Sequence, residues 1–323
     1  MTRVGPRFEG GKGSMRMDSL PAGPTLVLRV GSIATVIATY ALVVLGSTVR
    51  VTESGMGCSS WPLCNGKIGP LDNYHAVLEQ THRYLAAAVT IGVFAVLAAA
   101  RRARAGRRVL VPALAAAGMV AVQVVLGAIT VFAGNAGWTV ALHLVGALLL
   151  LAAVVVTAVG ILVAEGSPGR VDGLVWWAAG SAFLLFVSGT IVVDGGASAA
   201  CQTWPWCTAS AGLGWKLPIV QLVHRTMAAV AGTLIVILAA RTVRRRSDGQ
   251  AARALAWSLI ALLPVQIAAG AVSAVLAAPA WAQDIHLAVG TAIWGCVVAL
   301  ADSVYLAAGL HVGARGPLAS ARG

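Results

Sequence analysis

Apolar runs of about 20 residues recur eight times along this chain, and a helix of that length crosses a lipid bilayer. Charged residues make up only 11% of the 323 residues, whereas about 25% is usual for soluble domains. We therefore predict an all-α polytopic membrane protein with eight transmembrane helices. The expected spans cover residues 26–48, 79–100, 109–132, 139–163, 174–194, 218–240, 254–278 and 284–307.

The net charge of +12 comes largely from arginines between the spans, in the connections at 101–108 and 241–253. Short basic connections of this kind stay on the cytoplasmic side of a membrane. This distribution predicts a multi-pass protein in the lipid bilayer with both termini cytoplasmic, and it argues against nucleic acid as a partner. Residues 1–25 and 308–323 are expected to be cytoplasmic tails, the first of them flexible.

Internal repetition divides the chain into two halves. Cys58-Ser-Ser-Trp-Pro-Leu-Cys64 recurs as Cys201-Gln-Thr-Trp-Pro-Trp-Cys207, at an offset of 143 residues. The same offset or one residue less relates further pairs: Gly46 and Gly189, His82-Arg83 and His224-Arg225, Gln123 and Gln266, Gly127 and Gly270, His143 and His286. Four spans return a chain to its starting side. We therefore predict two pseudo-symmetric four-helix bundles of the same topology, over 26–165 and 174–307.

Four histidines belong to this repeat, two in each half: His82, His143, His224 and His286. Each lies near the outer end of an even-numbered span, so the two of one half lie at similar depth and can face each other across a bundle. An ionisable side chain within a membrane span indicates function, although a histidine can also serve as a hydrogen bond between helices. Two imidazoles are too few for a structural zinc site but suit the two axial positions of a haem iron.

The two halves differ beside these histidines. Glu79 lies three residues before His82, on the same helical face, whereas Gln221 takes the equivalent place before His224. A carboxylate can accept protons or stabilise positive charge, so we expect catalysis in the first half and an electron-transfer haem in the second. The alternative is that Glu79 only forms a salt bridge with Arg83.

Three arginines near the outer ends are candidate partners for haem propionates: Arg50, Arg83 and Arg225. Simple interfacial placement of these long side chains is the other interpretation. The four cysteines of the repeat lie in loops on the oxidising side, where disulfides persist. Cys58 is expected to pair with Cys64 and Cys201 with Cys207, either as structural crosslinks or as redox-active pairs.

The chain resembles the haem A synthase family. The resemblance is carried by the segment from Gly46-Ser-Thr-Val-Arg50 through Cys58-Ser-Ser-Trp-Pro-Leu-Cys64-Asn-Gly66, by Glu79-Gln-Thr-His82-Arg83, and by the remaining repeated histidines. It covers about 26–307, and two cysteine-bearing loops are similar to the bacterial branch. Members often have Pro-Asp where this chain has Ser59-Ser60.

The resemblance implies an oxidoreductase of the bacterial cell membrane that makes haem A for cytochrome oxidase. A ring methyl of haem O is oxidised to an alcohol, then to a hydrate that loses water to leave a formyl group. It implies that His82 and His143 bind the iron of haem O, the substrate, beside Glu79, and that His224 and His286 bind a haem b cofactor. Haem O synthase is the implied source of substrate, and an electron-transfer partner remains unidentified.

Two other functions stay open at this point. A dihaem b-type electron-transfer protein would explain four histidines but neither the difference between Glu79 and Gln221 nor the cysteine loops. A membrane thiol–disulfide oxidoreductase would explain the cysteines but give the histidines no role.

Overall fold

The computed structural model describes residues 26–69, 73–163, 173–208, 214–245 and 249–313, without the side chains of 306–313. The predicted tail 1–25 lies outside the described residues. Within them, eight helices are long and apolar enough to cross a membrane, which confirms the predicted fold class. They are α1 Leu26–Val51, α2 Tyr74–Arg102, α3 Arg107–Phe132, α4 Gly137–Leu162, α5 Gly173–Asp194, α6 Lys216–Arg244, α7 Gly249–Val275 and α8 Ala280–Gly313.

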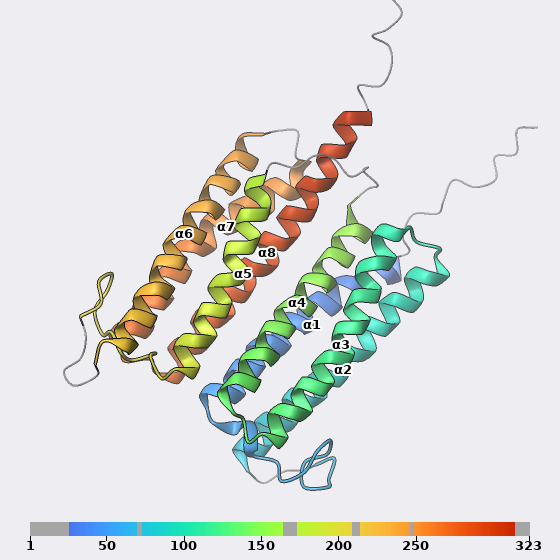
Figure 1. The fold of residues 1–323 in the computed structure, drawn as a ribbon. Coiled ribbons are helices and arrows are strands. Elements are labelled where there is room, and N and C mark those ends of the chain that lie inside the picture. Colours follow the sequence, from blue (N-terminus) through green and yellow to red (C-terminus); the bar gives the residue numbers. More distant parts are fainter. Residues whose placement is uncertain (1–25, 70–72, 164–172, 209–213, 246–248, 314–323) are drawn as a thin grey trace, which may run out of the picture.

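The helices form two groups of four that lie side by side (Figure 1). In the first group α1 packs on α2, α2 on α3, α3 on α4 and α4 on α1. In the second group α5, α6, α7 and α8 pack in the same cyclic order. Each group is therefore a closed ring in which α2 and α4, or α6 and α8, lie on the diagonal.

The seam between the two groups is formed by α1 and α4 against α5 and α8. The strongest contacts across it join α1 with α8 and α4 with α8, followed by α4 with α5. Because α4 and α8 are equivalent in the repeat, their contact lies where a pseudo-twofold axis is expected. Burial agrees, since α4 and α8 have 56% and 61% of their most apolar window buried, against 17–28% for the other six helices.

Several helices begin earlier than the hydropathy indicated. α2 starts at Tyr74 rather than residue 79, because the Asn73 side chain caps it by accepting a hydrogen bond from the backbone N–H of His75 at 2.8 Å. At the other end of the chain, α8 continues to Gly313, beyond the expected end of the last span at residue 307. Hydropathy underestimated the length of these helices because polar and charged residues occupy their ends.

Two loops carry the cysteines, and we call them the first cysteine loop (residues 52–69) and the second cysteine loop (residues 195–208). Both lie at the same end of the helices, opposite the end where α1 begins and α8 finishes (Figure 1). The first contains the short 3-10 helix η1 Ser54–Met56. This cysteine-loop end is where all four repeated histidines are found.

Candidate functional site

The four histidines occupy matched positions in the two rings. His82 follows the start of α2 by eight residues, as His224 follows the start of α6. His143 and His286 each follow the start of α4 or α8 by six residues. At a rise of about 1.5 Å per residue, all four lie roughly 9–12 Å below the helix starts. Each half therefore presents two imidazoles at one depth, from two helices on the diagonal of its ring.

The two imidazoles of each half lie on diagonal helices of one ring, His82 on α2 and His143 on α4, His224 on α6 and His286 on α8. All four side chains are half-buried. Helices on the diagonal of a four-helix ring face each other across the bundle interior, where cofactors are held by side chains of facing helices.

A glycine on the neighbouring helix lies beside each imidazole. A Cβ added at Gly46 of α1 would lie 3.1 Å from Cε1 of His82, and one at Gly127 of α3 would lie 3.4 Å from Cε1 of His143. In the second half the corresponding distances are 3.5 Å from Gly189 to His224 and 2.9 Å from Gly270 to His286. These repeated glycines therefore leave the space that the histidine rings occupy, which explains why glycine recurs at those positions.

The hydrogen bonds to the histidine rings differ between the halves. In the second half, the Ser188 hydroxyl donates to the Leu185 carbonyl at 2.7 Å and lies 2.8 Å from Nδ1 of His224. When Ser188 donates its proton to the Leu185 carbonyl, its oxygen can accept from Nδ1–H, the tautomer that leaves the Nε2 lone pair for a metal. The equivalent residue in the first half is Leu45, and Nδ1 of His82 is buried without a hydrogen-bond partner, as is Nδ1 of His286 in the second half.

A glutamine accompanies the other histidine of each half. The Gln123 amide nitrogen, with the amide oriented to satisfy its neighbours, lies 3.1 Å from Nδ1 of His143. Gln266 Nε2 lies 3.5 Å from Nε2 of His286. The sequence had shown these glutamines as repeat partners without giving them a role, and neither Ser188 nor its contrast with Leu45 had been noticed. The signal was available, because both serine and leucine precede a repeated glycine.

The donor set fits a haem better than a bare metal ion. Among the described residues, no group of three or more His, Cys, Asp or Glu side chains gathers as a metal cage. Each half offers two imidazoles on facing helices, and a porphyrin supplies the four remaining ligands of an iron. The contact of Ser188 with Nδ1 of His224 leaves Nε2 of that ring as the nitrogen available to an iron.

Glu79 is buried, with 4% of its surface exposed, and both of its oxygens have partners. Oε2 accepts from the backbone N–H of Cys58 at 2.8 Å, and Oε1 accepts from Nη2 of Arg83 in an ion pair. Arg83 also donates from Nη1 to the carbonyls of Ser60 and Pro62, at 2.8 and 3.0 Å. These two side chains thus bind the first cysteine loop to α2, so the predicted salt bridge is present. A catalytic role for Glu79 stays a prediction.

The second half uses an uncharged version of this arrangement. Gln221 donates to the carbonyls of Ala197 and Ser198, at 2.9 and 3.1 Å. Arg225 donates to the carbonyls of Thr203, Pro205, Trp206 and Cys201, at 2.8–3.2 Å. Both cysteine loops are therefore held by the arginine that follows the first histidine, and only the first half adds a buried carboxylate.

Arg50 lies at the seam between the halves. Its Nη2 is 3.8 Å from Oδ1 of Asp194 at the end of α5, while Ser47 donates to Asp284 of α8 at 2.6 Å. The Nε atom of Arg50 is buried without a hydrogen-bond partner. Three arginines were predicted to bind propionates. Arg50 has a buried Nε–H without a partner in the protein, whereas Arg83 and Arg225 donate hydrogen bonds to the cysteine loops.

Both predicted disulfides are present, between Cys58 and Cys64 and between Cys201 and Cys207. Cys58 and Cys64 are buried against Ala76 of α2. Cys201 is buried in a small apolar cluster with Val192 of α5. The sulfur atoms are thus packed between each loop and the helices below it.

Comparison with known proteins agrees with this geometry. The family described as "Cytochrome oxidase assembly protein" matches residues 29–80 and 71–298. A protein named heme A synthase from Symbiobacterium thermophilum is 31% identical over 285 residues, which cover 83% of this chain and 92% of that protein. The chain belongs to the haem A synthase family. A second relative of the same name, from Geobacillus thermodenitrificans, is 31% identical over 65% of this chain and 69% of its own length.

This chain is also similar to proteins that carry a different name. A protein named protoheme IX farnesyltransferase from Thermus thermophilus is 30% identical over 298 residues. The match covers 80% of this chain but only 45% of that protein. Family membership and the eight spans together identify this chain as a multi-pass membrane protein, and neither alternative function is favoured.

Proposed function

We propose that this chain is a haem A synthase that oxidises a ring methyl of haem O to a formyl group, with haem O in the first half and a resident haem b in the second. The observation that carries the proposal is the pair of imidazoles at one depth on the diagonal helices of each ring, in a haem A synthase family member. Neither a thiol oxidoreductase nor a simple electron carrier needs two such pairs together with a buried carboxylate beside only one of them.

The division of roles rests on the carboxylate of Glu79, which Gln221 replaces in the second half, and on the contrast between His82 and His224. A ligand whose Nδ1–H is fixed by a hydrogen bond is oriented and made more basic, which favours a permanent metal site. His224 has that support from Ser188, whereas its counterpart His82 lacks it. The other pair is arranged the opposite way, since His143 has Gln123 beside Nδ1 and Nδ1 of His286 has no partner, so the proposal concerns the histidines of α2 and α6. A substrate has to enter and leave, so the less strongly fixed histidine suits the haem that is converted.

In this proposal His82 and His143 hold and orient haem O, and Glu79 acts on it from one helical turn away. Oxidising a methyl group removes electrons and protons, so positive charge develops beside the ring. A buried carboxylate stabilises such charge or accepts a proton. Haem b, when bound between His224 and His286, supplies one-electron transfer. Arg50, with its unused Nε, is the proposed partner of a propionate at the cysteine-loop end.

We propose further that the cysteine-loop end faces outward and both termini face the cytoplasm of a bacterial cell, because the arginine-rich connections lie at the opposite end. A haem O synthase is the proposed supplier of substrate. The relative named protoheme IX farnesyltransferase supports this, since less than half of its length matches this chain and the rest is left for the named activity. A separate electron-transfer partner is also required.

Pigment analysis of the purified protein tests the function. We expect haem b together with haem O or haem A in the acid–acetone extract, and haem A in cells that carry this chain and a haem O synthase. An extract with haem b alone, from cells that do make haem O, would favour the electron-transfer protein. An extract without haem would exclude both.

A further inference from the structure

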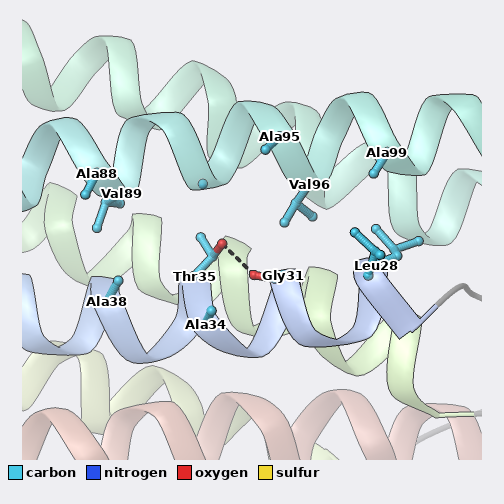
Figure 2. Close-up of a pocket in the computed structure, with 12 residues that line it drawn as sticks. Leu28, Gly31, Ala34, Thr35, Ala38, Ala88, Val89, Ala95, Val96 and Ala99 are labelled. Atoms are coloured by element: carbon cyan, nitrogen blue, oxygen red, sulfur yellow. Dashed lines mark hydrogen bonds between the residues drawn. The ribbon is translucent and has the colours of Figure 1, made fainter.

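A groove of about 300 Å³ runs between α1 and α2 on the surface of the first half (Figure 2). Its lining is almost wholly apolar, and the Thr35 hydroxyl within it is already bonded to the Gly31 carbonyl at 2.8 Å. Small residues open the groove, and they include Gly31, Ala34 and Ala38 of α1 and Ala88, Gly92 and Ala95 of α2. The groove therefore suits an elongated chain without polar atoms.

The groove lies between the same two helices, α1 and α2, that flank the His82 ring. The His82 ring is beside Gly46 of α1, and Val89, seven residues further along α2, lines the near end of the groove. Residues seven apart share a helix face, and Val89 lies roughly 10 Å below His82 at about 1.5 Å per residue. From Ala38 to Val27 the groove then extends for roughly another 16 Å by the same rise.

The second half has larger side chains at the equivalent positions. Leu174 and Trp177 of α5 stand where α1 has Gly31 and Ala34. The counterparts of the small residues of α2 are Val230, Leu234 and Ile237 on α6. Among lining positions with a described counterpart, the first half has the larger side chain at only two, Thr35 against Ala178 and Val89 against Ala231. Both Thr35 and Val89 are buried. The difference is thus concentrated at the open side of the groove, where a guest would enter.

We propose that this groove binds the farnesyl chain of haem O, which rests on the proposed function of the first half. The farnesyl chain is the part of haem O that haem b lacks, and it is long and apolar. A ring held by His82 between α2 and α4 brings the chain to the near end of the groove. When the farnesyl chain lies in the groove, its apolar carbons are in van der Waals contact with the small residues that line it. The groove then makes the first half prefer haem O, while the second half accepts haem b.

The test compares haem O with protohaem, which has no farnesyl chain. Gly31→Leu with Ala95→Ile gives the first half the residues found at Leu174 and Ile237. A Cβ at Gly31 meets only Val96, at 3.8 Å, so a side chain can be attached there without a clash at its first carbon. Ala115→Ile is the matched control, because Ala115 is exposed on α3 and does not line the groove. Each purified protein, with its second-half haem b in place, is titrated with both haems and followed optically.

We expect the dissociation constant for haem O to rise about tenfold or more in the double variant. Protohaem binding, the second-half haem b spectrum and the Ala115→Ile control should be unchanged. Equal haem O affinity in the double variant and the unaltered protein would overturn the proposal and leave the groove to membrane lipid. Equal weakening of both haems would also overturn it, because the effect would then concern the ring. An unaltered protein that binds no haem O would instead refute the proposed function.

Discussion

The two halves place the same pair of histidines at the same depth but surround them differently. In the second half, Ser188 lies beside the ring of His224, an amide at Gln221 holds the loop, and larger residues stand on α5 and α6 at the positions equivalent to the groove. In the first half, His82 has no partner at Nδ1 and the loop is held by the carboxylate of Glu79. One duplicated scaffold thus carries different side chains around matched histidines in its two halves, set by single residues outside the histidines themselves.

The largest effect should come from the ligands themselves. His224→Leu or His286→Leu removes one of the two axial ligands proposed for haem b, so we expect complete loss of its low-spin spectrum. His82→Leu, the repeat-matched control, should keep that spectrum because it changes only the other half. Optical spectra of the purified variants decide the matter. Loss of the spectrum in His82→Leu with retention in both second-half variants would reverse the roles assigned to the halves.

The next effect concerns the carboxylate. Glu79→Gln keeps an oxygen for the Cys58 N–H but removes the charge, and we expect haem A formation to fall by about 10²–10⁴, as for loss of a general acid or base. Haem b should stay, and haem O or its alcohol should accumulate. Pigments extracted from cells that carry only this variant measure the outcome.

Two further variants separate catalysis by Glu79 from its contact with the loop. Arg83→Gln breaks the same ion pair and leaves the carboxylate in place, so it should cost haem A much less than Glu79→Gln does. Gln221→Glu places a carboxylate in the second half and should not create a second reactive site. If Arg83→Gln were as damaging as Glu79→Gln, the carboxylate would act through the first cysteine loop instead of on the substrate.

A smaller effect is expected from the support of the His224 ring. Ser188→Ala removes the acceptor for Nδ1–H, and loss of such a partner commonly weakens metal affinity by about 10–100-fold. The rate at which haem b passes to excess apomyoglobin reports this change and should rise about tenfold. Leu45→Ser is the mirror variant, since it offers His82 a partner and should slow haem loss from the first half. Unchanged rates in both would mean that ring support does not distinguish the halves.

The smallest expected difference between the halves lies in their disulfides, because both are closed and packed under their loops. Mass spectrometry of protein alkylated at lysis should find all four loop cysteines unmodified before reduction. After reduction and alkylation, both pairs should be labelled together. A second cysteine loop that was found open while the first was closed would show that only the first crosslink is structural.

The sequence by itself determined the eight spans, the duplication and the four histidines. In a bilayer the backbone has to satisfy its hydrogen bonds within each helix, so a long apolar run is sufficient to identify a span. Helix ends were less accurate, as the start of α2 at Tyr74 shows, because a cap such as Asn73 acts beyond the apolar run. The pairing of cysteines was also predictable, since a short loop brings its own ends together.

Only the tertiary structure decided which side chains meet across helices. That Gly46 lies beside His82, that Ser188 holds His224, and that Glu79 and Arg83 hold the first cysteine loop all depend on how separate helices pack. The groove between α1 and α2 has the same origin, because Gly31 and Ala95 open a space only where two helix faces meet. Hydropathy is a property of one segment, whereas a site is made by the register and rotation of several, and these are fixed by packing.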